Sequence, residues 1–197
     1  MNRDDFPILS NNDLIYFDNG ATTLKPKILL ESTNDYYSKY TANAHRGDYD
    51  NSLIVDTKYE HTRELVRDFI GAKSSKEIIF TSGCTDSLNK IIFGYFKYYL
   101  KSDDEVLITK SEHASNVLPW FELADEINCK VKYIKLTDDL KVTLENVKDA
   151  ITPKTKVISI AHITNVAGDI RPIKEITKYA HEHDILVVVD GAQSVAH

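Results

Sequence analysis

Cysteine is scarce in this sequence: among 197 residues, only Cys84 and Cys129 carry a thiol. Two thiols in a chain of this length do not make the disulfide framework that holds small secreted proteins together, and they are typical of a reducing compartment. The N-terminus, MNRDDFPILS, is acidic where a secretory signal needs basic residues followed by a long apolar stretch. We therefore expect a cytoplasmic protein.

An excess of positive charge and a long hydrophobic run are also missing. The formal net charge is -6, and the lysines are spread singly instead of forming a patch. Because an acidic surface does not attract polyanions, we expect neither nucleic acid nor an anionic membrane as a partner. The longest apolar runs, such as ILVVV at 185–189, are far too short to cross a bilayer.

The sequence has no repeats and no Gly/Ser/Pro-rich linkers. Strand-like and helix-like segments instead alternate along it. Short runs rich in β-branched residues predict strands at 76–83, 104–110, 130–136, 156–162 and 185–191. The spacing of apolar residues predicts helices at 52–70, with Gly71 as the C-terminal cap, at 85–100 and at 172–184. This order predicts an α/β fold with a mostly parallel sheet flanked by helices on both faces, in three α/β/α layers.

Polar side chains follow the predicted strands, at the edge where parallel sheets bind ligands. SGCTDS at 82–87 begins a helix, whose free N–H groups suit a phosphate. His113 and Asn165 follow two of the strands, and Asp190 and Gln193 come at the end of the last one. A buried carboxylate needs a positive partner or good donors, although an aspartate here can equally accept hydrogen bonds from the next turn. Together these groups predict a site for a phosphorylated cofactor with a ring nitrogen.

Motifs along nearly the whole chain resemble the class V, fold-type I enzymes that depend on pyridoxal 5′-phosphate (PLP), and among them the cysteine desulfurase and selenocysteine lyase group. In chain order, these motifs are DNGATT (18–23), NAHRG (43–47), FTSGCTDSLN (80–89), EHASNVLPW (112–120), HITNVAGDIRPIKEI (162–176) and VVVDGAQSVAH (187–197). The resemblance implies that 21–197 form the N-terminal part of the PLP-binding large domain. Residues 1–20 would pack with a small domain in the full-length enzyme.

The resemblance assigns the cofactor to particular residues. It implies that the backbone around Cys84 and Thr85 holds the PLP phosphate and that His113 stacks on the pyridine ring. Asp190 would pair with the ring nitrogen and keep it protonated, so that the ring accepts electrons. Cys84 departs from the family, which usually has threonine there. Its place at a helix N-terminus lowers a thiol's pKa, but it matches the phosphate loop and not the family's sulfur acceptor.

Other residues are assigned to the substrate or to a second subunit. Asn165 and Gln193 would lie near the ring hydroxyl and the substrate, while Ala21, His45 and Arg46 would serve the substrate or an active site across a dimer interface. The resemblance also implies an amino-acid substrate, L-cysteine or L-selenocysteine, a homodimer, and a sulfur-acceptor protein of the kind used in iron-sulfur cluster assembly. No metal site is expected.

The lysine that forms the Schiff base with PLP in these enzymes lies shortly beyond the motif at 187–197, where this sequence stops. The family's substrate-carboxylate arginine and sulfur-accepting cysteine also lie further on. We therefore expect an N-terminal portion of a cysteine desulfurase or selenocysteine lyase that is inactive alone. Two alternatives stay open: another class V aminotransferase or a kynureninase-like PLP enzyme, and a folded half-domain without enzymatic activity.

Overall fold

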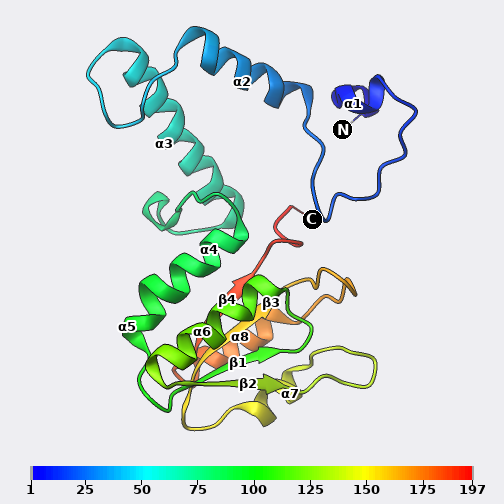
Figure 1. The fold of residues 1–197 in the computed structure, drawn as a ribbon, viewed down its shortest axis with the longest axis vertical. Coiled ribbons are helices and arrows are strands. Elements are labelled where there is room, and N and C mark those ends of the chain that lie inside the picture. Colours follow the sequence, from blue (N-terminus) through cyan, green and yellow to red (C-terminus); the bar gives the residue numbers. More distant parts are fainter. Residues whose placement is uncertain (1, 197) are drawn as a thin grey trace. The chain divides into compact units, whose positions relative to one another are not determined.

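The computed structural model describes residues 2–196, and the chain divides into two compact units, Met1–Phe80 and Thr81–His197 (Figure 1). The first unit contains the helices α1 (Pro7–Ser10), α2 (Lys27–Lys39) and α3 (Asp50–Ile70), with 3-10 turns at Arg3–Asp5 and Ser75–Glu77. Helix α3 ends as predicted, because Gly71 has a φ of 70°, the left-handed conformation that glycine adopts without strain.

A four-stranded parallel sheet with the strand order β2-β1-β3-β4 forms the centre of the second unit. The strands are β1 (Glu105–Thr109), β2 (Lys130–Ile134), β3 (Thr155–Ala161) and β4 (Leu186–Asp190). The connecting helices are α6 (Leu118–Ile127), α7 (Leu144–Ala150) and α8 (Ile173–His181). These elements confirm the parallel sheet, the α/β class and the strands expected within 104–191.

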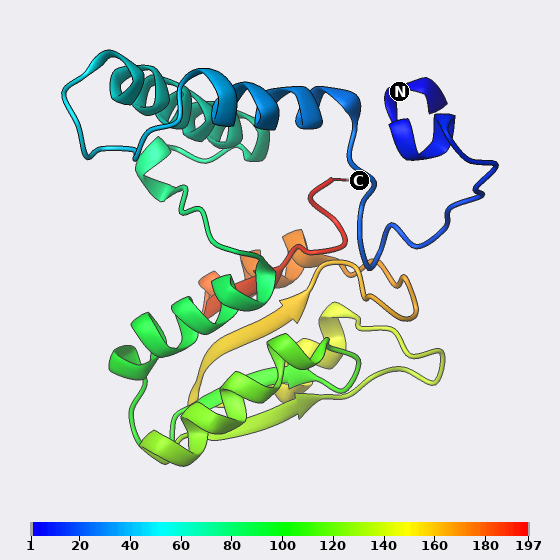
Figure 2. The ribbon, with the colours of Figure 1, turned by 45° about the horizontal axis from the view of Figure 1, so that its top comes forward.

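Helices cover both faces of this sheet (Figure 2). Because side chains alternate along a strand, Val106 of β1 faces one side and its neighbour Leu107 faces the other. Val106 belongs to a buried cluster with Trp120 of α6 and with residues of the helix before β1, whereas Leu107 packs in a second cluster with residues of α7 and α8, such as Ile176. The sheet is therefore the middle layer of three, as predicted.

The helix predicted at 85–100 is confirmed, although its hydrogen bonding changes along its length. It consists of α4 (Cys84–Ile91), a π-helical segment (Ile92–Phe96) and α5 (Lys97–Tyr99). Ile92 and Phe96 are buried in the cluster that contains Trp120, and the rings of Phe96 and Trp120 lie 5.2 Å apart between centroids. This packing fixes α4 on the sheet and thereby places its N-terminus.

The prediction of a strand at 76–83 is wrong. Ser75–Glu77 forms a 3-10 turn, and residues 78–83 join no sheet in the described part of the chain. The carbonyl of Ile78 instead accepts a hydrogen bond from the side chain of Arg63, and the ring of Phe80 packs edge-on against Tyr59 with 5.4 Å between centroids. A β-branched run becomes a strand only where another strand pairs with it, and here α3 supplies the partners.

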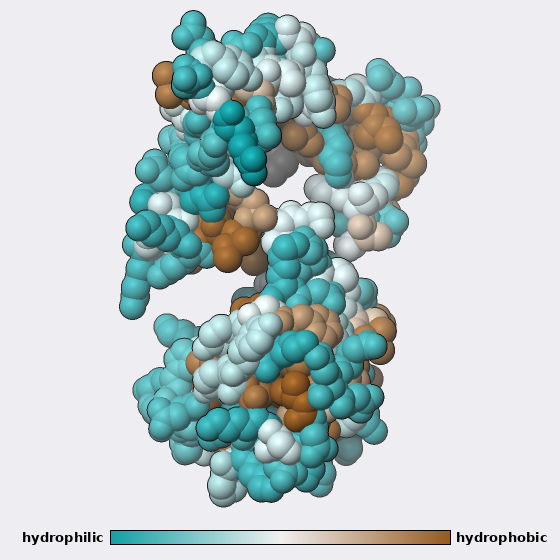
Figure 3. Space-filling view, turned by 60° about the vertical axis from the view of Figure 1, so that its left-hand side comes forward, coloured by the Kyte–Doolittle hydropathy of each residue, from teal (hydrophilic) through white to brown (hydrophobic). Residues whose placement is uncertain are grey.

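The first unit exposes large apolar side chains on its helices. Ile28 of α2 is 68% exposed, and Leu53 and Phe69 of α3 are 67% and 72% exposed. Figure 3 shows hydrophobic residues in patches on an otherwise hydrophilic surface. Both buried hydrophobic clusters belong to the second unit. Apolar patches of this kind are typical of surfaces that another chain or domain covers.

Within residues 2–196, every helix is too short or too polar to cross a membrane.

Candidate functional site

The carboxyl ends of β1, β3 and β4 carry four of the predicted site residues. His113 and Asn165 follow β1 and β3, Asp190 is the last residue of β4, and Gln193 lies in the turn after it. Because the strands are parallel, these residues share one edge of the sheet. The strand order changes direction between β1 and β3, which is where parallel sheets of this type bind ligands.

Asp190 is buried and directly contacts the start of α4. Its Oδ1 accepts hydrogen bonds from the backbone N–H of Ala192 at 3.0 Å and from Sγ of Cys84 at 3.3 Å. The first bond is the turn contact that an aspartate makes with the residues after it. The second joins the two parts of the predicted site that are furthest apart in the sequence.

The expectation that the helix N-terminus lowers the pKa of Cys84 is wrong. Partial burial, and then the hydrogen bond and the negative charge of Asp190, raise the pKa of this thiol from 9.0 to about 11. Burial disfavours the charged thiolate, and a neighbouring carboxylate repels it. Cys84 is therefore a neutral hydrogen-bond donor at physiological pH.

The chain enters α4 through Gly83 in a conformation that only glycine adopts easily, with φ 156° and ψ 176°. A Cβ placed on Gly83 meets no atom within 4 Å, so the space beside the helix N-terminus is open. The first N–H groups of a helix have no partner inside it and attract an oxyanion. Asp86, in the same turn, has its pKa lowered by hydrogen bonds from Lys90 and Ser82, so its charge has partners already.

Ser115 connects two of the predicted residues. Its hydroxyl lies 2.8 Å from Oγ1 of Thr85 and 3.0 Å from Nδ1 of His113. The backbone N–H of Ser115 donates to the same Nδ1 at 3.2 Å, so Nδ1 is an acceptor and neutral His113 carries its proton on Nε2. The prediction missed this serine. Its role is visible only in the structure, where His113 caps the 3-10 turn Ala114–Asn116 and so brings Ser115 against the His113 ring.

His113 and Asn165 line the same cavity, whose volume is about 540 Å³. Its lining also includes the apolar side chains of Leu136, Leu140 and Val166. A cavity of this volume, mainly apolar with a few polar groups, is typical of small-molecule sites. The structure thus brings His113, the residue predicted to stack on the ring, and Asn165, a predicted hydrogen-bonding residue, to one cavity.

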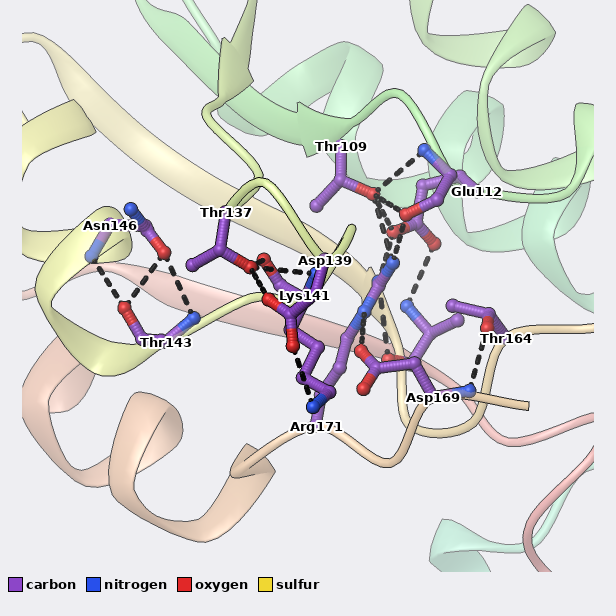
Figure 4. Close-up of polar contacts among 12 residues, drawn as sticks. Thr109, Glu112, Thr137, Asp139, Lys141, Thr143, Asn146, Thr164, Asp169 and Arg171 are labelled. Carbon is purple, nitrogen blue, oxygen red and sulfur yellow. Dashed lines mark hydrogen bonds and ion pairs between the residues drawn. The ribbon is translucent and has the colours of Figure 1, made fainter. Parts of the chain in front are cut away.

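A buried ion pair, also missed by the sequence prediction, lies beneath this edge of the sheet. The side chains of Glu112 and Arg171 are both 0% exposed, and Arg171 Nη1 pairs with Glu112 Oε1 (Figure 4). Arg171 Nη2 donates to Thr109 Oγ1 at 3.0 Å and to Ser111 Oγ at 2.7 Å. Charged residues next to a turn are usually solvated, so nothing in the sequence marks these two as buried partners.

Ala21, His45 and Arg46 belong to the first unit, where all three are exposed. The backbone N–H of His45 donates to Oδ1 of Asp56 at 2.6 Å, and its Nε2 lies 3.2 Å from Oε1 of Glu60. Helix α3 therefore holds the loop that carries His45. The part of these three residues in a site across a dimer interface stays a prediction.

Within residues 2–196, no three His, Cys, Asp or Glu side chains lie together in a group that could hold a metal ion.

Comparison with known proteins identifies the family. The sequence matches the aminotransferase class-V family over residues 15–197, and the chain belongs to this family. It is 44% identical over 200 residues to a probable cysteine desulfurase from Borreliella burgdorferi, covering 99% of this chain and 47% of that protein. It is 40% identical over 196 residues to a probable cysteine desulfurase from Halalkalibacterium halodurans, covering 98% of this chain and 48% of that protein.

Solved structures confirm the predicted fold. The apo structure of a cysteine desulfurase from Thermococcus onnurineus NA1 has a TM-score of 0.92 at 37% identity, covering 99% of this chain and 48% of that chain. The cysteine desulfurase CsdA from Escherichia coli has a TM-score of 0.89 at 30% identity, covering 99% of this chain and 49% of that chain. The chain spans about half the length of the curated relatives it matches.

Proposed function

We propose that this chain is the N-terminal, PLP-binding half of a cysteine desulfurase, which removes sulfur from L-cysteine to give L-alanine and an enzyme-bound persulfide. The observation that carries the proposal is the buried carboxylate of Asp190 at the end of β4, in contact with the N-terminus of α4. Residues 21–197 are then part of the large domain. Residues 1–20 pack with a small domain.

The residues at the sheet edge fit PLP. The open space beside Gly83 and the N–H groups of Cys84 and Thr85 suit the phosphate, because they provide donors without a blocking side chain. Asp190, a buried carboxylate, stabilises a proton on a ring nitrogen. Bound PLP supplies an electron sink for the bond that breaks at the substrate Cα. His113 is assigned to the face of the ring.

The remaining residues orient these groups. Cys84 donates its neutral S–H to Asp190 and so helps to orient the carboxylate. Ser115 fixes the tautomer of His113, which leaves Nε2–H as the donor of that ring. Asn165 and Gln193 are assigned to the ring hydroxyl and the substrate. L-selenocysteine is the alternative substrate within the same group of enzymes.

We propose a second copy of the chain and a sulfur-acceptor protein as partners. The exposed apolar side chains of α2 and α3 support a homodimer, since a helix face of this kind is usually covered. Ala21, His45 and Arg46 would then serve a site that includes the partner subunit. Light scattering tests this proposal: a dimer mass is expected, and a monomer mass at high concentration contradicts it.

Product analysis tests the proposed chemistry in the protein that contains this chain, loaded with PLP. We expect L-alanine and persulfide from L-cysteine, and in Asp190→Ala a large fall in turnover even at PLP concentrations that saturate the variant. Glu126→Gln, which removes an exposed carboxylate of α6 that pairs with Lys97, is the control and should keep full turnover. A keto acid in place of L-alanine would favour the class V aminotransferase alternative. Unchanged turnover in Asp190→Ala would show that Asp190 is only a turn residue.

A further inference from the structure

Both carboxylate oxygens of Glu112 are held by several donors. Oε1 accepts hydrogen bonds from Arg171 Nη1 and from the hydroxyl of Thr109, the latter at 2.7 Å. Oε2 accepts hydrogen bonds from the backbone N–H of Ala161 at 2.8 Å and from Nδ2 of Asn116 at 2.9 Å. Thr109 ends β1 and Ala161 ends β3, so Glu112 ties its own loop to the ends of the two central strands.

Arg171 anchors a different loop to the same place. Its backbone N–H donates to the carbonyl of His162 at 2.9 Å, and its Nε lies 3.9 Å from Oδ2 of Asp169. Directly before it, Ile163 and Ile170 form an isolated antiparallel bridge, so the chain between them is a closed hairpin. Arg171 therefore stands at the base of this hairpin.

Each partner of the ion pair adjoins a residue of the candidate site. Glu112 immediately precedes His113, and the hairpin held by Arg171 carries Asn165. His113 and Asn165 line the same cavity of about 540 Å³. The ion pair thus joins the two loops whose side chains meet at that cavity, while its own charged groups lie out of solvent.

Stability alone does not explain a buried ion pair, because well-packed apolar residues of similar volume often stabilise a fold equally well or better. Charge-assisted bonds from a planar guanidinium are directional, however, and select one arrangement of the groups they join. We propose that Glu112 and Arg171 are positioning residues that hold the His113 and Asn165 loops in one relative arrangement at the cavity. The relevance of this arrangement to PLP rests on the proposed function, but the arrangement itself does not.

Hydrogen exchange measured by mass spectrometry tests the proposal on this chain. In Glu112→Gln, which keeps the shape and removes the charge, we expect amides of 111–117 and 162–170 to exchange roughly tenfold faster, with β1 and residues 155–160 of β3 unchanged. Arg171→Lys should behave in the same way, because an ammonium keeps the charge but loses the planar fork. Glu126→Gln, the matched change at the exposed Lys97–Glu126 pair, should leave both segments as in the wild type.

A spectroscopic signature separates positioning from general stability. Nitrogen NMR of the His113 ring should show the single Nε2–H tautomer in the wild type and a mixture in Glu112→Gln, because Ser115 no longer stays aligned with Nδ1. If Glu112→Gln does not fold, Ser111→Ala removes one Arg171 contact without a charge and should give a smaller effect of the same kind. Loops that keep wild-type exchange and a single tautomer in the folded variants would overturn the proposal.

Binding of PLP provides the separate arm that depends on the proposed function. Weaker PLP binding by Glu112→Gln than by Glu126→Gln is expected if the cavity edge holds the cofactor. Wild-type protein that does not bind PLP would contradict the proposed function, whereas the exchange and tautomer results would still decide the role of the ion pair.

Discussion

The thiol of Cys84 donates a hydrogen bond to the carboxylate of Asp190 over 3.3 Å, which joins the first residue of α4 to the last residue of β4. These are the two places where the sequence predicts a phosphate-holding turn and a carboxylate for a ring nitrogen. Burial, followed by this hydrogen bond, raises the pKa of the thiol to about 11. The contact therefore keeps Cys84 protonated and orients Asp190.

Alkylation kinetics measure this coupling. In a Cys129→Ala background, the rate of Cys84 with iodoacetamide should follow the thiolate fraction and rise with a midpoint near pH 11. Asp190→Asn removes the negative charge and should shift the midpoint to lower pH, so that alkylation at pH 9 becomes faster. Glu126→Gln should leave the midpoint unchanged. A wild-type midpoint at or below the ordinary value of 9.0 would contradict the coupling.

Trp120 offers a test of the packing that places α4. Its side chain is fully buried, and its Nε1 has no hydrogen-bond partner among the described residues. Trp120→Ala should lower the free energy of unfolding by about 3–5 kcal/mol through the cavity it leaves. Trp120→Phe should cost about 1–2 kcal/mol, because it keeps the ring contact with Phe96 and removes an unsatisfied donor. Urea unfolding measures both, and equal losses in the two variants would count against this packing.

Glu105 should make the fold sensitive to acid. Burial alone would raise the pKa of Glu105, but hydrogen bonds from Lys132 and Thr152, both at 2.6 Å, outweigh burial and lower it below its ordinary value of 4.5. Because the folded-state pKa is the lower one, the stabilisation is complete above the unfolded-state pKa and is lost as pH falls through the folded-state pKa. Urea midpoints measured from neutral to acid pH should therefore fall less steeply in Glu105→Gln than in the wild type. Parallel pH profiles of the two proteins would exclude this role.

The fold was predictable wherever local sequence and tertiary partners agree. The β-branched runs around Val106 and Val157 lie between helical segments that pack on the sheet, and there the expected strands form. The run around Ile79 is also rich in β-branched residues, but it pairs with no strand in the described part of the chain, and Ile79 remains 76% exposed. Composition describes what a segment tolerates, whereas pairing depends on residues elsewhere in the chain.

The candidate site was predictable to the extent that topology places it. His113 and Asp190 follow from the rule that parallel strands present their carboxyl ends to ligands, together with the family resemblance. Glu112 and Arg171 could not be paired from the sequence, because their contact depends on how two loops fold over the ends of β1 and β3. The raised pKa of Cys84 likewise depends on burial and on Asp190, which the sequence around the helix N-terminus does not reveal.

Binding of pyridoxine 5′-phosphate to this chain tests the central claim most directly, because this analogue keeps the phosphate and the ring nitrogen but has no aldehyde to react with surface lysines. We expect saturable binding at one site, about tenfold or more weaker binding of pyridoxine, which lacks the phosphate, and a comparable loss in Asp190→Ala but not in Glu126→Gln. Titration calorimetry gives all of these affinities. Equal binding of the two ligands, together with no effect of Asp190→Ala, would contradict a cofactor site between α4 and β4.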